Sequence, residues 1–442
     1  MADEDFDLVI GLGITGKSCV RYLAAQGMPL RALDTRARPP GIEEFREQYP
    51  DVALHTGGWR EDWLEQARRL VVSPGVAVST PEIARQMAAG KEVIGDVELF
   101  ARAVRAPVVA ITGSNAKSTV TTLLGEALHA AGVRALTGGN LGTPALDLLE
   151  ADARLYVMEL SSFQLETTWS LDASVATVLN VSQDHLDRYQ SVADYIAAKQ
   201  RIYDDCQTAV WNRDQEATRP QHPVSREITF GMHEQSDYRL DVATGNLYAR
   251  GEFLLHSAEL ALPGHHNALN VLAVLALAEA LELPRATVLE VACRFSGLPH
   301  RCQRVAERDG VQWFNDSKGT NLGATLAALS GIGDVIEGKV VLIAGGQAKD
   351  QDFGALAQAA RGQVRAAVLI GEDAERIAAV LEVVPVFIEE DMAAAVRRAN
   401  DVAEPGDAVL LSPACASFDM YSGYVARGED FIRQVREVHD AR

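Results

Sequence analysis

The sequence contains little cysteine, and no two cysteines have the spacing of a redox or zinc-binding pair. The chain of 442 residues has five, which are Cys19, Cys206, Cys293, Cys302 and Cys415. An odd number at wide spacing is typical of free thiols in a reducing compartment. A small protein held together by disulfide bonds is therefore excluded.

The chain also lacks the features of exported and membrane proteins. It opens with the acidic segment Met1–Asp5, whereas a signal peptide opens with a basic region. No uninterrupted apolar run reaches the roughly 20 residues of a membrane-spanning helix. The sequence therefore predicts a soluble, cytoplasmic protein with no membrane partner, and we expect a monomer.

Positive charge is scarce relative to negative charge. Lys and Arg total 41 against 61 for Asp and Glu, which gives a formal net charge of -20. A surface of this sign argues against nucleic-acid binding, so any phosphate site must be built locally from backbone amides and a few cations. A nucleophile elbow and a Ser-His-Asp or Cys-His arrangement are also missing, so covalent enzyme catalysis is not indicated.

What the sequence does have is a regular alternation of strand-like and helix-like segments. Such alternation indicates parallel βαβ units, and hence an α/β fold. We expect three domains. They are a Rossmann-like domain over 1–95, a central P-loop ATPase-type parallel sheet over 96–298 with a small antiparallel sheet within 238–255, and a C-terminal Rossmann-like domain over 299–442.

The most informative segment is the polar turn that follows the apolar strand at 108–111. It leads into Lys117, Ser118 and Thr119 and then into a helical run over 120–131. This order surrounds an anion with backbone amides, with a Lys for the outer phosphates and a Ser hydroxyl for Mg²⁺. Ala116 stands where glycine is usual, and we expect it at negative φ, so that Ala116→Gly changes ATP affinity little. An ordinary strand–turn–helix with a solvated Lys is the alternative.

A second glycine-rich turn, 11–16, follows the first strand. With Asp34 at the end of the next strand it matches the pattern of a dinucleotide-binding turn, although nothing in it specifies which nucleotide binds. Ser73, Pro74 and Gly75 follow a later strand and are expected to line the same crevice, unless they form a plain turn.

Polar residues follow strands in the central block as well. Glu159 follows the strand at 155–158 and is placed to hold Mg²⁺, and the segment 180–188 includes His185, which can ligate a second divalent ion. The alternatives are a solvated Glu and a capped helix start. Lys199, taken alone, is typical of a solvated surface lysine. Asn267 precedes the apolar helix at 268–281, as a cap or as an adenine-facing group.

In the last block, three polar loops each follow a strand. They cover 315–321, 345–350 and 412–419. Because the carboxyl ends of neighbouring parallel strands meet at one edge of a sheet, we expect these loops to share one rim and to form a binding crevice.

Five segments, met in order along nearly the whole chain, resemble the successive blocks of the Mur ligases, ATP-dependent enzymes that build the peptide of the peptidoglycan precursor. They are Ala110–Thr119, Glu159–Leu165, Asn180–Arg188, Gly264–Asn267 and Leu298–Arg301. Within the family, Asn315–Asn321 and Leu411–Asp419 are similar to the members that join D-glutamate to UDP-N-acetylmuramoyl-L-alanine. The Asp-Asn-Pro-Arg signature of members that add diaminopimelate is absent, and Ala116 departs from the family's glycine.

The resemblance implies a mechanism and its residues. The alanyl carboxylate attacks the γ-phosphoryl group of ATP, and the amine of D-glutamate then displaces phosphate from the acyl phosphate. The catalytic residues implied are Lys117, His185 and Lys199. Two Mg²⁺ ions are implied at Ser118, Glu159, His185 and Lys199. A CO₂-derived carbamate is implied on Lys199, and it would replace the positive charge of the lysine ammonium with the negative charge of a carboxylate-like group.

The remaining site residues are implied in the same way. The UDP-substrate residues are Gly13, Ile14, Thr15, Asp34, Thr35, Arg36, Ser73, Pro74, Gly75 and Asn140, the last lying toward the sugar and acyl end. The ATP residues are Gly113, Ser114, Asn115, Ala116, Lys117, Ser118, Thr119, Asn267, Arg301 and Asp316. The D-glutamate residues are Lys318, Thr320, Lys349, Ser417 and Tyr424, where the hydroxyl of the tyrosine has no assigned role.

Three other functions fit parts of the sequence. An NAD-dependent oxidoreductase explains the turn at 11–16 but leaves the Lys117 segment unexplained. A UDP-sugar-binding protein without catalysis would keep its function in Lys117→Ala. A folylpolyglutamate synthase shares the central block but lacks a UDP crevice, so UDP binding separates it.

Overall fold

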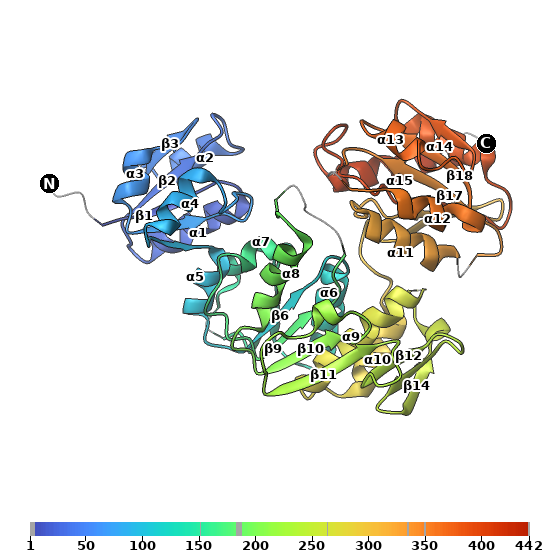
Figure 1. The fold of residues 1–442 in the computed structure, drawn as a ribbon, viewed down its shortest axis with the longest axis horizontal. Helices are drawn as coiled ribbons and strands as arrows, with labels where there is room; N and C mark the ends of the chain where they lie inside the picture. Colours follow the sequence, from blue (N-terminus) through green and yellow to red (C-terminus); the bar gives the residue numbers. More distant parts are fainter. Residues whose placement is uncertain are drawn as a thin grey trace.

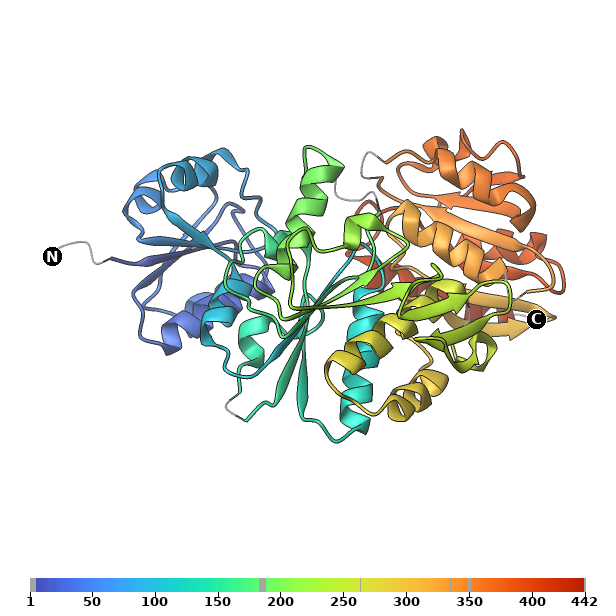
Figure 2. The same cartoon turned by 60° about the horizontal axis from the view of Figure 1, so that its bottom comes forward.

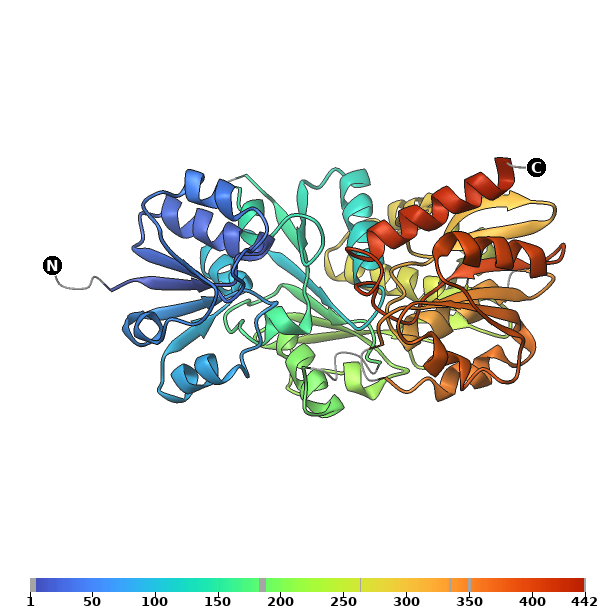
Figure 3. The ribbon, with the colours of Figure 1, turned by 90° about the horizontal axis from the view of Figure 1, so that it is seen from above.

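The structure, a computed structural model, describes residues 5–150, 152–182, 188–262, 264–333, 336–348 and 351–440. Three α/β units follow one another along the longest axis of the molecule (Figure 1). The N-terminal and C-terminal units lie at opposite ends, and the central unit joins them, in each of two further views (Figure 2 and Figure 3). In the described residues, the strands form sheets of five, nine and six strands, as the α/β pattern predicts.

The first unit is a parallel sheet with strand order β3-β2-β1-β4-β5. Its strands are β1 Asp7–Ile10, β2 Leu30–Asp34, β3 Ala53–Thr56, β4 Arg69–Val72 and β5 Glu92–Ile94, and its helices are α1 Ile14–Ala25, α2 Ile42–Gln48, α3 Glu61–Gln66 and α4 Pro81–Ala88. Helix α5, Asp96–Ala103, follows β5 and opens the second unit. The order reverses between β1 and β4, and ligands of open α/β sheets bind at such a reversal.

The glycine-rich turn is shorter than the sequence suggests. Helix α1 begins at Ile14, directly after Gly13, so Gly16 belongs to its first turn. A Cβ on Gly16 would lie 1.8 Å from the Gly11 carbonyl oxygen. Only glycine therefore allows α1 to approach β1 this closely.

The second unit is built on a nine-stranded sheet with order β14-β13-β12-β11-β10-β9-β6-β8-β7. Its strands are β6 Val108–Thr112, β7 Ala135–Gly139, β8 Leu155–Glu159, β9 Val175–Val178, β10 Thr208–Asn212, β11 Arg226–Gly231, β12 Tyr238–Asp241, β13 Asn246–Ala249 and β14 Glu252–His256, and its α-helices are α6 Lys117–Ala130, α7 Ser162–Leu165, α8 Val192–Gln200, α9 His265–Ala280 and α10 Arg285–Arg294. The predicted small antiparallel sheet is present as β12, β13 and β14, and it is continuous with the central sheet because β12 pairs in parallel with β11.

The apolar helix α9 forms the core of the second unit. It packs on α6, α10, β11 and β12, and ten of its residues are buried. A helix that is apolar on nearly all sides is stable only when other elements surround it. It begins at His265 with Gly264 at the N-cap position and no side-chain cap, so Asn267 is not needed as a cap.

The third unit is a six-stranded sheet with order β15-β16-β20-β17-β18-β19. Its strands are β15 Gln303–Arg308, β16 Val311–Asn315, β17 Val340–Gly345, β18 Val364–Ile370, β19 Val386–Ile388 and β20 Ala408–Leu411, and its helices are α11 Leu322–Gly333, α12 Gly354–Gln363, α13 Ala374–Ala378, α14 Met392–Val402 and α15 Tyr424–Asp440. All pairs are parallel except β15 with β16. Of the helices in the described ranges, none combines the length and apolarity needed to cross a membrane.

Candidate active site

Three cavities follow one another through the interfaces of the three units. We call them the N-terminal cavity of about 500 Å³, the central cavity of about 310 Å³ and the α9 cavity of about 310 Å³. Asn140 lines both the N-terminal and the central cavity, and Asn115, Arg301 and Lys318 line both the central and the α9 cavity. One continuous site therefore runs from the first sheet to the third.

The N-terminal cavity contains all the residues predicted to face a uridine diphosphate. These are Gly13, Ile14, Thr15, Asp34, Thr35, Arg36, Ser73, Pro74, Gly75 and Asn140. Asp34 accepts from the Leu12 N–H at 2.7 Å and from Arg36 Nη2 at 2.7 Å. Burial raises the pKa of the Asp34 carboxyl, but the hydrogen bonds from Arg36 and Leu12 outweigh it and lower the pKa below its usual value. This carboxylate therefore fixes the glycine-rich turn and holds Arg36 at the cavity wall.

The phosphate-type loop connects β6 to α6, and its conformation differs from the prediction at one residue. Ala116 has φ 66° and ψ -3° and is the N-cap residue of α6. The expected negative φ is therefore wrong. Asn180 Oδ1 accepts from the Asn115 N–H at 2.8 Å and Asn180 Nδ2 donates to the Asn115 carbonyl at 3.2 Å. This double clamp fixes the backbone next to Ala116, so the left-handed conformation is set by tertiary contacts that the local sequence does not reveal.

The cations of the loop region are held against backbone carbonyls. Lys117 Nζ donates to the carbonyls of Gly113 at 2.8 Å and Ser114 at 3.1 Å. Lys199 Nζ, from α8, donates to the same Gly113 carbonyl at 2.9 Å and lies 4.5 Å from the centre of the Tyr195 ring. Lys199 is only 2% exposed, so the interpretation of it as a solvated surface lysine is wrong.

Glu159, at the end of β8, has the environment of a cation ligand. Its Oε1 accepts from Asn140 Nδ2 at 2.8 Å, and within the described residues its buried Oε2 has no hydrogen-bond partner. Both Glu159 and Lys117 line the central cavity. A buried carboxylate oxygen left unpaired is costly, and a divalent cation at this cavity would satisfy it. The residues present therefore fit Mg²⁺.

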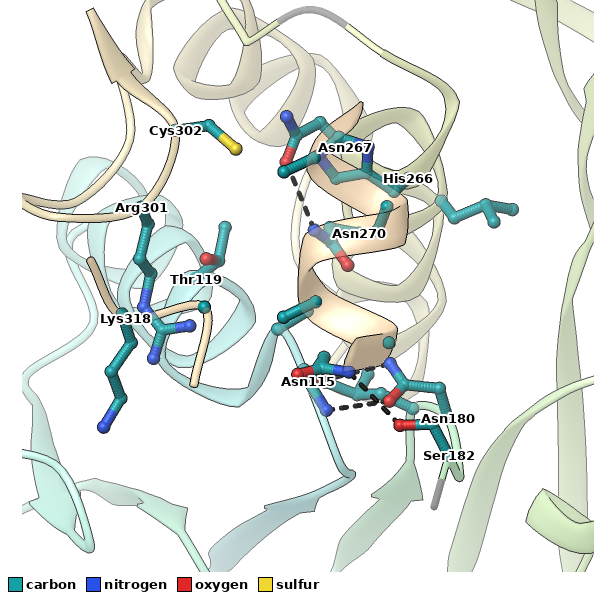
Figure 4. A pocket seen from close by; sticks show the side chains of 18 of the residues that line it. Asn115, Thr119, Asn180, Ser182, His266, Asn267, Asn270, Arg301, Cys302 and Lys318 are labelled. Atoms are coloured by element: carbon teal, nitrogen blue, oxygen red, sulfur yellow. Dashed lines mark hydrogen bonds between the residues drawn. The ribbon is translucent and has the colours of Figure 1, made fainter. Parts of the chain in front are cut away.

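Arg301 connects the last unit to the phosphate loop. Its Nη2 donates to Ser118 Oγ at 2.7 Å, so two residues predicted for the ATP site are in contact although 183 positions separate them. Figure 4 shows Arg301 and Lys318 on one side of the α9 cavity, with Asn267 and Asn270 on α9 and Asn115, Asn180 and Ser182 at its lower end. Asn270 Nδ2 donates to Asn267 Oδ1 at 3.4 Å, and the rest of the wall includes the apolar Leu179, Phe230 and Leu298. Apolar walls with a few amides suit a nucleobase.

Asp316 follows β16 and lies in the wall of the α9 cavity. Its Oδ2 accepts from Ser412 Oγ at 2.7 Å and its Oδ1 accepts from the Cys302 N–H at 3.1 Å. Burial raises the pKa of this carboxyl from 3.8 to about 6. The loops after β16 and β20 are therefore joined through a carboxyl group, and the predicted common rim of these loops is confirmed.

The other end of the central cavity is lined by the C-terminal unit. Lys318, Thr320, Ser417 and Tyr424, all predicted to hold D-glutamate, line this cavity together with the exposed Phe418. Lys318 Nζ lies 4.1 Å from the centre of the Tyr424 ring. The aromatic ring therefore orients the ammonium group by a cation–π interaction, which explains an aromatic residue at position 424 without using its hydroxyl.

Arg427 supports this end of the site and was missed by the sequence reasoning. It is 1% exposed, and its guanidinium donates to the carbonyls of Ser317 at 2.9 Å, Cys415 at 3.1 Å and Gly345 at 3.4 Å. Burial lowers the pKa of Arg427 to about 10. One cation thus joins all three loops of the rim, and nothing in the local sequence of α15 shows which carbonyls it reaches.

Comparison with known proteins agrees with this arrangement. Residues 6–95 match the model for the MurD-like N-terminal domain of Mur ligases, residues 111–278 match the Mur ligase middle domain, and residues 300–415 match the Mur ligase glutamate ligase domain. The chain belongs to the Mur ligase family. Each of the three matched segments includes all or nearly all the strands of one of the three sheets.

Curated relatives align with this Mur ligase from end to end. A UDP-N-acetylmuramoylalanine–D-glutamate ligase of Alcanivorax borkumensis is 64% identical over 441 residues and covers 100% of both chains. The protein of the same name from Nitrosococcus oceani is 50% identical and covers 98% of this chain and 96% of the relative.

Solved structures agree on the fold. The UDP-N-acetylmuramate-alanine ligase MurC from Thermotoga maritima has a TM-score of 0.62 at 18% identity, with 98% of this chain and 99% of that chain covered. MurF ligase from Thermotoga maritima in complex with ADP also has a TM-score of 0.62, at 16% identity, with 99% and 96% covered.

Some predicted site residues cannot be compared with the geometry. His185, predicted to serve the second metal ion, and Lys349, predicted for D-glutamate, lie outside the described residues. Within the described ranges, no group of three or more His, Cys, Asp and Glu side chains forms a metal cluster. Two residues that support the phosphate loop had no predicted role. They are Asn180 and Tyr195, and the hydroxyl of Tyr195 lies 3.0 Å from Ser114 Oγ. For Asn180, its position after β9 was a usable signal.

Proposed function

We propose that this Mur ligase joins D-glutamate to UDP-N-acetylmuramoyl-L-alanine in an ATP-dependent reaction of peptidoglycan precursor synthesis. The reaction thereby serves growth of the cell wall and cell division. The observation that carries the proposal is the continuous line of three cavities, in which single residues belong to two cavities at once. A ligase of this kind must bring a UDP-linked acid, ATP and an amino acid together, and the curated relatives carry the name of this activity.

The domains divide the substrates among them. The first unit, 1–95, binds the UDP group in the N-terminal cavity. The second, 96–298, binds ATP in the α9 cavity, with the nucleobase near Asn267 and the phosphates at the loop 113–119. The third, 299–442, contributes Arg301 and Asp316 to ATP and holds D-glutamate in the central cavity. The reacting carboxylate then lies near Asn140, which lines the boundary of two cavities.

The chemistry is phosphoryl transfer followed by acyl transfer. Lys117 and the amides of the phosphate loop neutralise the transferred phosphoryl group as the alanyl carboxylate attacks it, since such transfer depends on positioning and charge stabilisation. The amine of D-glutamate attacks the acyl carbonyl, and inorganic phosphate leaves. Lys318, oriented by the Tyr424 ring, pairs with a carboxylate of D-glutamate and aims the amine.

Four of the predicted site residues would hold divalent metal ions. Ser118 would hold one Mg²⁺ ion together with Glu159 Oε2, which has no hydrogen-bond partner in the part of the chain that the structure describes. His185 and Lys199 would serve a second ion. When bound, Mg²⁺ neutralises phosphate charge during transfer. A carbamate on Lys199, formed with CO₂, would supply a negative ligand from a side chain that is buried beside the Gly113 carbonyl. Mass spectrometry of the intact protein under CO₂ trapping would detect this carbamate.

The test is release of inorganic phosphate from ATP and Mg²⁺. We expect release only when UDP-N-acetylmuramoyl-L-alanine and D-glutamate are both present. Turnover with L-glutamate in place of D-glutamate should be lower. Lys117→Ala should abolish release, whereas Lys339→Ala, which changes an exposed lysine of the third unit, should leave it unchanged. Equal turnover with both glutamate enantiomers, or none with either, would refute the assignment.

Ligand binding and the Lys117→Ala variant distinguish the alternative functions. Binding of UDP argues against a folylpolyglutamate synthase, and a change in nicotinamide fluorescence on titration would favour an oxidoreductase. An unchanged function in Lys117→Ala would favour a binding protein without catalysis.

A further inference from the structure

Arg188 lies at the junction of the first two units and has no part in the proposed chemistry. Its Nη1 donates to the Pro74 carbonyl at 2.7 Å, and its Nη2 donates to the Glu166 carboxylate at 2.7 Å and to the Val76 carbonyl at 3.5 Å. The side chain of Arg188 is 10% exposed and that of Glu166 is 13% exposed. A shielded guanidinium thus joins the loop after β4 to the residue that follows α7.

The loop that Arg188 contacts is a wall of the N-terminal cavity. It is firmly attached to the first unit, because Ser73 Oγ donates to the Gly11 carbonyl at 2.6 Å and the Val76 N–H donates to the Ser73 carbonyl at 2.9 Å. Arg188 therefore does not merely order a loose loop. It fixes the place of an already ordered loop relative to the second unit.

On the other side, Arg188 contacts a helix that borders the central cavity. The centre of its guanidinium lies 4.1 Å from the centre of the Phe163 ring, and Phe163 lines the central cavity while its neighbour Gln164 lines the N-terminal cavity. Ser161 and Gln164 form a capping box that fixes the start of α7. The planar fork of arginine can stack on a ring and donate from its edges at the same time, which the ammonium of lysine cannot do.

We propose that Arg188 is a positioning residue for the UDP-linked substrate. It fixes the distance between the loop that holds the UDP group and the cavity in which the alanyl carboxylate reacts. Binding energy from a remote group accelerates a reaction only if that group is held at the correct distance from the reacting atoms. The inference rests on the proposed function, since it requires a substrate that is anchored at one end and reacts at the other.

The test compares two substrates in Arg188→Lys and Arg188→Met. One is UDP-N-acetylmuramoyl-L-alanine, and the other is its analogue that ends at the sugar 1-phosphate and lacks the uridylyl group. We expect kcat/KM for the full substrate to fall about 10- to 100-fold, as for the loss of one or two hydrogen bonds from a charged group. Turnover of the truncated analogue should remain within about twofold, because it does not use the UDP loop.

Arg21→Met is the matched control. Arg21 crosses the same domain boundary and pairs with Asp147 at 2.5 Å, but its side chain is 51% exposed and it lines none of the three cavities. We expect this variant to leave both substrates unaffected. A general loosening of the boundary would instead reduce turnover in Arg21→Met and in the Arg188 variants alike, and would overturn the inference.

The remaining outcomes are also decisive. Equal loss for both substrates in the Arg188 variants, or no loss for the full substrate, would overturn the inference and leave the proposed function intact. If wild-type protein releases no phosphate with D-glutamate, the proposed function fails, and the inference with it. Should Arg188→Met unfold at the assay temperature, Arg188→Lys decides alone, because it keeps a cation beside Glu166.

Discussion

Replacing Ala116 with glycine should stabilise this protein. Ala116 occupies the left-handed region with φ 66° and ψ -3°, where the Cβ of an L-residue approaches the following carbonyl oxygen at a cost of about 1–2 kcal/mol. Glycine removes that cost but gives the unfolded chain more freedom, which lowers stability by about 0.5–1 kcal/mol. The central values of the two ranges differ by about 0.75 kcal/mol, so we expect Ala116→Gly to stabilise the protein by about that amount.

Thermal melting measures this gain. For a unit of about 200 residues we expect the melting temperature to rise by about 1–4 °C. The control is Ala130→Gly, at the exposed, right-handed C-terminal end of the same helix α6, which should lower the melting temperature because glycine weakens a helix. The same chemical change in one helix is therefore expected to act with opposite signs.

The nucleotide affinity gives an independent test of the reasoning. Asn180 clamps both the N–H and the carbonyl of Asn115, so we expect the loop to keep the same strained conformation when ATP binds. The Kd for ATP should then stay within about twofold in Ala116→Gly, since strain common to both states cancels. A melting temperature below that of the wild type would refute the argument. So would ATP binding about tenfold tighter, equal to about 1.4 kcal/mol, because the strain would then arise only on binding.

Three further predictions concern the site. Glu159→Gln keeps the acceptor for Asn140 but loses the negative charge, so the Mg²⁺ concentration for half-maximal phosphate release should rise about tenfold or more; an unchanged Mg²⁺ titration would contradict the metal assignment. Because burial raises the pKa of Asp316 to about 6, its ionisation opposes folding, and stability should fall as pH rises from about 4 toward 6 and stay reduced above it. Asp316→Asn should therefore melt higher than wild type at pH 8 by an amount worth about 2–3 kcal/mol, with only about a third of that difference left at pH 4.5, and a pH-independent difference would exclude this cause. Tyr424→Phe keeps the ring beside Lys318 and should leave the KM for D-glutamate unchanged, whereas Tyr424→Leu should raise it by an amount worth about 0.5–1 kcal/mol; equal KM values in both variants would argue against the cation–π contact.

Much of the fold could be predicted because its signals are local. The apolar run at 108–111 became β6, Val108–Thr112, and polar residues after strands led correctly to the rim formed by Asp316 and Ser412. The antiparallel strands were also predicted, but not their attachment to the central sheet through β11 and β12. Pairing between strand edges depends on partners distant in the sequence, which periodicity does not identify.

The candidate site divides in the same way. The residue types of the phosphate loop, of the glycine-rich turn at 11–16 and of the strand end at Glu159 indicated nucleotide and metal chemistry. Lys199, in contrast, looked like a surface lysine, and only the fold places it beside Gly113. The contacts of Arg427 and Arg188 could not be predicted from the sequence, because their partners are backbone carbonyls and side chains of other segments.

The sequence by itself determined the α/β class, the phosphate loop, the order of the three domains and the family, because strand and helix periods, turn chemistry and motif spacing are written in neighbouring residues. Only the tertiary structure decided which loops share a cavity, that Ala116 is left-handed and that Arg188 links the UDP loop to α7. The physical reason is that burial, hydrogen-bond partners and backbone strain arise from contacts between residues far apart in the chain.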